Sequence, residues 1–219
     1  MSAFLTLVFA LIRRDLLRSA TSGSLWLPVI FFLLVATLYP FAVGPNPEML
    51  ARTGGGMLWV AALLAALLPV DRLFLADKEA GVLDQLAVRG VSDEIVVLAK
   101  LVAHWLGFSI PLLIACFPAS ALLNLSGESL ALLLTGLLIG SPALAALAVM
   151  VAALTTGLRG AGAIGGLLLL PLAVPILIFG AGMLGSESGA AIKFLAASSL
   201  FLTAICPFAA GAALRGARA

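Results

Sequence analysis

The chain has 219 residues, of which 63% are hydrophobic and only 10% are charged. A soluble globular domain carries about 25% charged residues, so this composition excludes a chain that covers its whole surface with polar side chains. The formal net charge of +2 is small, and in so apolar a chain the placement of the positive residues is more informative than their sum. The composition therefore predicts an all-α protein that crosses a membrane several times.

The first predicted element is a helix over about residues 2–18. Its apolar run, Ala3–Ile12, is too short to cross a bilayer. Three arginines follow this run, whereas a signal peptide carries its positive charge before the apolar region. We expect a helix at the cytoplasmic membrane interface. The apolar residues expected to enter the lipid are Phe4, Leu5, Val8, Phe9, Leu11 and Ile12.

Six stretches without Asp, Glu, Lys or Arg follow, at 19–47, 53–70, 101–127, 129–158, 160–186 and 194–214. A membrane-spanning helix needs roughly 20 apolar residues, so each stretch is long enough for one crossing and too short for two. The sequence therefore predicts a single permease domain over residues 1–219 with six transmembrane helices. Their approximate bounds are 24–43, 55–73, 101–123, 130–156, 161–184 and 194–214.

The Lys and Arg residues indicate the orientation of these spans. If the N-terminus is cytoplasmic, only Arg52 and Lys193 lie on the outside. The other ten then lie inside: Arg13, Arg14, Arg18, Arg72, Lys78, Arg89, Lys100, Arg159, Arg215 and Arg218. Cytoplasmic segments carry the excess of Lys and Arg in membrane proteins. Both termini are therefore expected in the cytoplasm.

Two features within the predicted spans concern packing. Gly136 and Gly140 are four residues apart, a spacing that permits close helix contact. Aromatic residues near the predicted span ends are expected at the membrane interface. They are Trp26, Tyr39, Trp59 and Trp105.

Several kinds of chemistry have no support in the sequence. No ionisable residue lies deep in a predicted span, which argues against a proton-coupled carrier. No Lys follows a Gly, so the phosphate-binding pattern GxxxxGK[ST] is absent and ATP would have to be bound by another subunit. We expect no catalytic residue, no metal site and no directly bound cofactor. His104, the one histidine, is the single candidate haem ligand, against the commoner role of a hydrogen bond to a neighbour.

One predicted cytoplasmic connection, residues 71–100, is substantial and carries ten charged residues. Within it, Asp77–Val88 has the pattern of a short amphipathic helix. Gly81 either weakens this helix or lets another backbone approach closely. The segment is either a solvated surface helix or a docking helix for a cytoplasmic partner, and the number of charges favours docking. The residues on its apolar face are Val82, Leu83 and Leu86.

The segment DKEAGVLDQL (Asp77–Leu86) resembles the cytoplasmic loop of type 2 ABC exporter permeases, which contacts the ATPase subunit. The resemblance implies that the ATPase-coupling residues are Asp77, Glu79, Gly81, Leu83, Asp84 and Leu86.

The rest of the chain resembles the haem exporter protein B (CcmB) family. LPVIFFLLVATLYPFAVGP (Leu27–Pro45) is similar to its first span, and MLWVAALLAALLPVDRLF (Met57–Phe74) to its second. LAKLVAHWL (Leu98–Leu106) resembles the start of its third span. LTTGLRGAGAIGGLLLLPLAVPILIFG (Leu154–Gly180) resembles its Gly-Leu-Arg turn and fifth span. The resemblance covers essentially the whole chain.

This resemblance implies the permease subunit of an ABC transporter for c-type cytochrome biogenesis in a bacterial inner membrane. The implied partners are an ATPase subunit, a haem-handling membrane subunit, a small membrane subunit and a periplasmic haem chaperone, with two copies of this chain in the complex. Haem is the implied cargo, and ATP hydrolysis either moves haem or releases the loaded chaperone. The alternatives are an ABC permease for a lipid, glycan or drug, and a non-transporting scaffold for the ATPase and a haem-loading partner.

Overall fold

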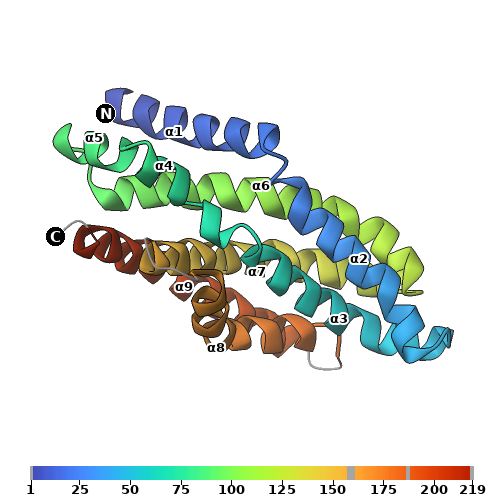
Figure 1. The fold of residues 1–219 in the computed structure, drawn as a ribbon. Helices are drawn as coiled ribbons and strands as arrows, with labels where there is room; N and C mark the ends of the chain where they lie inside the picture. The colour runs from blue at the N-terminus through green and yellow to red at the C-terminus, as the bar shows by residue number, and fades with distance from the viewer. Residues whose placement is uncertain (1, 157–160, 186–187, 218–219) are drawn as a thin grey trace.

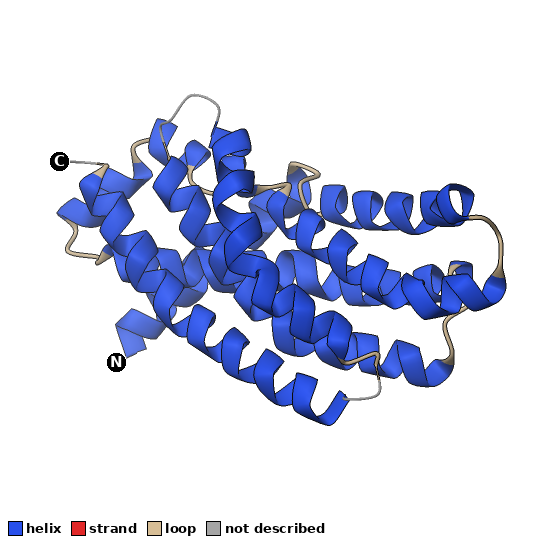
Figure 2. Ribbon diagram, turned by 90° about the horizontal axis from the view of Figure 1, so that it is seen from below, coloured by secondary structure: helices blue, strands red, loops and turns tan. Residues whose placement is uncertain are grey.

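The computed structural model describes residues 2–156, 161–185 and 188–217, and every regular element within these ranges is a helix (Figure 2). The all-α expectation is therefore confirmed for the part of the chain that is described. In chain order the elements are α1 (Ser2–Thr21), α2 (Trp26–Val43), α3 (Pro47–Leu67), the 3₁₀ helix η1 (Val70–Arg72), α4 (Leu75–Glu79), α5 (Val82–Val88), α6 (Asp93–Leu122), α7 (Gly127–Thr155), α8 (Ala161–Gly182) and α9 (Ser188–Gly216).

The lengths of the apolar helices support a multi-pass membrane protein. By length and composition, α2, α6, α7, α9 and the segment that begins with α3 can each cross a membrane. Helix α8 has 22 residues, but its apolar part with described side chains, Leu167–Gly182, is shorter than a span. The sixth crossing therefore stays a prediction. Arg159 and Arg218, two of the cations assigned to the cytoplasmic side, lie outside the described residues.

Helix α7 is the centre of the bundle and packs against α3, α6, α8 and α9 (Figure 1). Every residue from Ala143 to Ala153 is buried, so this half of the helix has no exposed face. A helix that is apolar and buried all round belongs to the interior of a bundle. Helix α2 differs, because its buried residues form one stripe and large apolar side chains such as Phe41 are exposed on the rest.

Three glycines form the space for one large side chain, Trp59 of α3. The indole is 1% exposed. A methyl group added at Gly180 of α8 would lie 2.5 Å from Trp59 Cε2, and one added at Gly140 of α7 would lie 2.8 Å from its Cη2. Gly136 is also in contact with this ring. The interfacial placement expected for Trp59 is therefore wrong, and Gly136 and Gly140 make room for an indole in the core.

The two ends of the bundle differ. The start of α1, the short helices α4 and α5 and the end of α9 lie together at one end, and the α2–α3 and α6–α7 turns lie at the other (Figure 1). At the α2–α3 turn, Asn46 Oδ1 accepts hydrogen bonds from the backbone N–H groups of Glu48 and Met49, with Pro47 as the first helical residue. This is a favourable way to begin a helix at a tight turn.

Helix α1 runs beside the first half of α6 and is packed against it (Figure 1). Leu5 and Phe9 are exposed, as expected for side chains that enter lipid, but Leu11 is buried at 8% exposure. The expectation that Leu11 enters the lipid is therefore wrong, because this face of α1 is covered by the protein. The side chain of Phe4 lies outside the described part of the chain.

Candidate functional site

The connection between α3 and α6 contains two short helices in place of the single helix predicted over Asp77–Val88. Helix α4 ends at Glu79 and α5 begins at Val82. Gly81 separates them with a φ of +65°, in the left-handed region that residues with a Cβ atom rarely adopt. Nothing lies within 4 Å of a Cβ atom placed at Gly81, so the backbone conformation, and not a close approach by another segment, is the reason for a glycine here.

The apolar face predicted for this segment is confirmed in α5. Leu83 is buried in the main core, and Leu86 is half-buried against it. Asp84 and Glu79 are exposed. The end of α5 is also exposed, with Val88 at 89%. The connection therefore has an inner side anchored by Leu83 and an outer side on which Glu79, Asp84 and Val88 are exposed.

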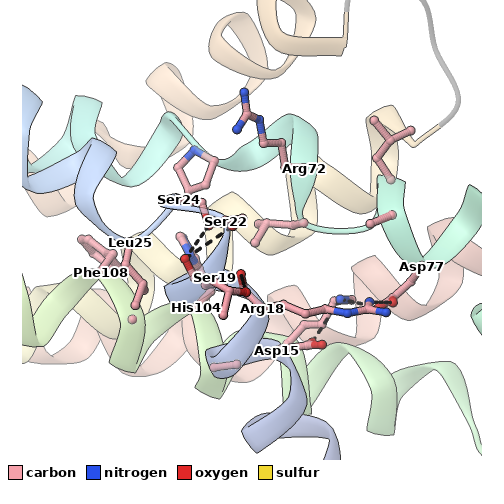
Figure 3. A pocket seen from close by; sticks show the side chains of 18 of the residues that line it. Asp15, Arg18, Ser19, Ser22, Ser24, Leu25, Arg72, Asp77, His104 and Phe108 are labelled. Atoms are coloured by element: carbon pink, nitrogen blue, oxygen red, sulfur yellow. Dashed lines mark hydrogen bonds and ion pairs between the residues drawn. The ribbon is translucent and has the colours of Figure 1, made fainter.

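Asp77 differs from the other candidate coupling residues, because its side chain is only 1% exposed. Its carboxylate is paired with three cations: Arg14 Nη2 at 2.7 Å, Arg18 Nη1 at 2.6 Å and Lys100 Nζ at 2.7 Å. Asp15 joins the same group through Lys100 Nζ at 3.1 Å and Arg14 Nη2 at 2.8 Å. We call these five residues the ion-pair cluster (Figure 3 shows Asp15, Arg18 and Asp77). Asp77 thus faces the protein interior and is not free to contact a partner.

The ion-pair cluster joins three separate segments. Arg14, Asp15 and Arg18 belong to α1, Asp77 to α4 and Lys100 to α6. Burial by itself lowers the pKa of the Arg14 guanidinium, but the carboxylates of Asp15 and Asp77 more than offset this, and the pKa lies above its ordinary value. The sequence indicated these cations only as topology signals. One signal in the sequence could have indicated the cluster: Arg14, Asp15 and Arg18 lie close together on one short stretch of α1.

Beside the ion-pair cluster lies a cavity of about 590 Å³, bounded by the α1–α2 elbow, by η1 and α4, and by α6 (Figure 3). Asp77, Arg18 and Lys100 line one part of it, and apolar side chains such as Leu25 and Phe108 line another. A volume of this size is within the usual range for pockets that bind small molecules. The arrangement therefore combines a charged wall with an apolar one.

His104 lies in the wall of this cavity, on α6. The ring is 8% exposed and stacks on Phe108, with 5.3 Å between the ring centroids. Its Nε2 atom is buried and has no hydrogen-bond partner in the structure. Buried polar atoms without a partner are rare in folded proteins. Among the described residues, no group of three His, Cys, Asp or Glu side chains is placed to hold a metal ion.

Comparison with known proteins gives one family over nearly the whole chain. The family model described as CcmB protein matches residues 6–217. Heme exporter protein B of Paracoccus denitrificans is 46% identical over 212 residues, which cover 94% of this chain and 97% of the relative. The proteins of the same name from Rhodobacter capsulatus and Escherichia coli (strain K12) are 45% and 39% identical over 94% and 86% of this chain, and over 97% and 88% of their own lengths. By this near-complete match and its apolar helical bundle, the chain belongs to the CcmB family.

Proposed function

We propose that this chain is the membrane-spanning permease subunit of an ABC-type haem export system that serves c-type cytochrome biogenesis. The observation that carries the proposal is the similarity to heme exporter protein B over nearly the full length of both chains. The apolar helices long enough to cross a membrane support it, because a permease provides the path or the moving part within the bilayer. The chain itself is proposed to be non-catalytic, with ATP hydrolysed by a separate subunit.

The α4–α5 connection is the proposed contact with that ATPase subunit. Glu79 and Asp84 are exposed and can pair with basic side chains of a partner. Leu83 packs in the hydrophobic core, so a displacement of α5 by a bound partner would also displace the helices packed against it. Asp77 serves the same coupling from the inner side, because it joins α4 to α1 and α6. Gly81 provides the break between the two short helices.

The orientation and the partners are part of the same proposal. The start of α1, the end of α9 and the α4–α5 connection share one end of the bundle (Figure 1), which supports six spans with both termini in the cytoplasm. We assign the chain to the bacterial inner membrane, with α1 beside the cytoplasmic interface. Its proposed partners are two ATPase subunits, a haem-handling membrane subunit, a small membrane subunit and a periplasmic haem chaperone, with two copies of this chain in a type 2 exporter arrangement.

Deletion of the gene tests the proposal. Membrane and periplasmic proteins of the deletion strain are denatured, separated and stained for haem, with and without a plasmid that restores the chain. We expect covalently attached haem to disappear from the c-type cytochromes and to return on complementation. Unchanged staining in the deletion strain would show that this chain has no role in cytochrome c maturation, and an ABC permease for another cargo would replace the proposal.

A further inference from the structure

The turn between α5 and α6 makes the position of α5 depend on the start of α6. Gly90 has a φ of +75°, in the left-handed region in which many helices end. Its N–H donates to the carbonyl of Ala87 at 2.9 Å, and the N–H of Val91 donates to the carbonyl of Leu86 at 3.0 Å. The side chains of Val91 and Leu86 both pack against the core, as is frequent in this helix-ending motif. A turn closed by two hydrogen bonds and an apolar contact leaves α5 little freedom to move relative to α6.

The start of α6 is attached to its neighbours on two sides. Lys100 joins the ion-pair cluster and so links α6 to α1 and α4. Glu94 forms an ion pair with Arg215 of α9, in which Arg215 Nη1 donates a hydrogen bond to Glu94 Oε1. Because a helix turns by about 100° per residue, Glu94 and Lys100 leave α6 in directions roughly 120° apart. The Glu94–Arg215 pair therefore adds α9 to the helices that hold this end of α6.

Both helices favour this contact. Glu94 lies in the first turn of α6 and Arg215 in the last turn of α9, where the helix dipoles favour an acidic and a basic residue respectively. Gly211, one turn before Arg215, lets α9 come close to α6. A methyl group added at Gly211 would lie 3.0 Å from Glu94 Oε1 and 3.1 Å from its Cδ. Glycine is less favourable than alanine inside a helix, and this close approach is a physical reason for a glycine here.

The Glu94–Arg215 pair contributes more to geometry than to stability. The Arg215 side chain is 53% exposed and that of Glu94 is 29% exposed. Ion pairs with this exposure add little to the free energy of unfolding, because water and salt screen them. The pair nevertheless joins the last turn of α9 to the first turn of α6, and the rigid turn just before α6 carries α5. Loss of the pair would therefore change the position of α5 while leaving the bundle folded.

We propose that Glu94 and Arg215 are positioning residues for the contact with the ATPase subunit. The pair holds the start of α6 against α9 and, through the α5–α6 turn, keeps α5 in the orientation in which the ATPase subunit binds it. Without the pair, α5 is in this orientation for only a fraction of the time, and the apparent affinity for the ATPase subunit falls by that fraction. This inference rests on the proposed function, because it needs an ATPase subunit that binds the α4–α5 connection.

Binding of the purified ATPase subunit to the immobilised full chain in detergent tests the proposal, together with the thermal unfolding midpoint of each variant. We expect Arg215→Gln to weaken the affinity by about 2- to 10-fold. The amount of ATPase subunit bound at saturation should stay at the wild-type level. The unfolding midpoint should fall by no more than about 2–4 °C. A general loss of structure would instead lower the bound amount and the midpoint together.

Three further variants separate the contact from the charges that make it. Arg215→Lys keeps the positive charge and should retain most of the affinity. Gly211→Leu keeps both charges but places its side chain where the Glu94 carboxylate lies, so it should weaken binding as Arg215→Gln does. Arg13→Gln removes an exposed arginine of α1 and should bind like the wild type.

Three results would overturn the proposal. Equal affinities of the wild type, Arg215→Gln and Gly211→Leu would show that the pair does not position α5, and the proposed function would stand. A weakened affinity accompanied by a much lower midpoint and less bound ATPase subunit would give the pair a structural role only. If the wild-type chain itself binds no ATPase subunit, the proposed ATPase contact of the α4–α5 connection fails and this inference fails with it.

Discussion

The ion-pair cluster predicts that the substitution Asp77→Ala lowers the thermal stability of the protein. The carboxylate of Asp77 contacts Arg14, Arg18 and Lys100 together. Its removal leaves three cations close to one another with Asp15 as the remaining carboxylate of the cluster. Helix α4 thereby loses the ion pairs that join it to α1 and α6.

The size of the effect follows from the burial of the groups left behind. Removing one partner of a buried ion pair costs about 3–5 kcal/mol. The lower end of this range applies here, because Lys100 keeps Asp15 at 3.1 Å and the Arg18 side chain is 51% exposed. For a chain of 219 residues, a loss of about 3 kcal/mol lowers the unfolding midpoint by roughly 6–12 °C.

Thermal unfolding of the purified chain in detergent measures this shift. Asp84→Ala makes the same change at an exposed carboxylate of α5 and should move the midpoint by no more than about 1–2 °C. The double variant Asp77→Ala/Lys100→Met removes the buried cation as well and should recover part of the loss, because replacing both charges by apolar groups is often nearly neutral. An Asp77→Ala variant that unfolds at the wild-type temperature would refute the structural role of the cluster.

Three further substitutions test other parts of the structure. Gly180→Ala adds a methyl group 2.5 Å from the Trp59 indole and should cost about 1–3 kcal/mol of unfolding free energy, whereas Gly56→Ala, with open space around it, should be neutral or slightly stabilising in the same thermal assay. Gly81→Ala should cost about 1–2 kcal/mol, because alanine is strained at a φ of +65°, and denaturant unfolding measures it. Asp84→Lys should lower ATP hydrolysis by the assembled transporter severalfold while leaving membrane insertion unchanged, as measured by an ATPase assay and membrane fractionation.

Each of these has an outcome that contradicts it. Equal unfolding midpoints for the Gly180→Ala and Gly56→Ala variants would mean that the indole moves aside without cost. Gly81→Asn should be less damaging than Gly81→Ala, because asparagine tolerates the left-handed region better, and the reverse order would rule out backbone strain as the cause. Glu48→Lys, an exposed position in the first turn of α3, is the control for Asp84→Lys. If the Asp84→Lys transporter hydrolyses ATP at the same rate as the control, Asp84 does not belong to the surface that contacts the ATPase.

The candidate site was predicted in part from the sequence. The apolar anchor Leu83 and the exposed Asp84 follow from helical periodicity, which assigns faces within one helix correctly. The resemblance implied that Asp77 is an ATPase-coupling residue, but its side chain is buried because its partners come from α1 and α6, at sequence separations of 59 and 63 residues for the two arginines. Periodicity within a helix carries no information about a charge on a distant segment. For Gly81 the sequence left two readings open, a weakened helix or a close backbone approach. The structure supports the first, because a glycine in the sequence does not by itself reveal a positive φ.

What the sequence by itself determined is the helical bundle. Long apolar stretches without charge must satisfy their backbone hydrogen bonds internally, and a helix is the way in which one segment alone can do so. The family and the clustering of Lys and Arg are likewise properties of the chain read in order. Only the tertiary structure decided which side chains meet: Trp59 with the glycines of α7 and α8, Asp77 with three cations, and His104 with the cavity. These contacts depend on how separate helices pack, because shape and charge are matched between segments far apart in the chain.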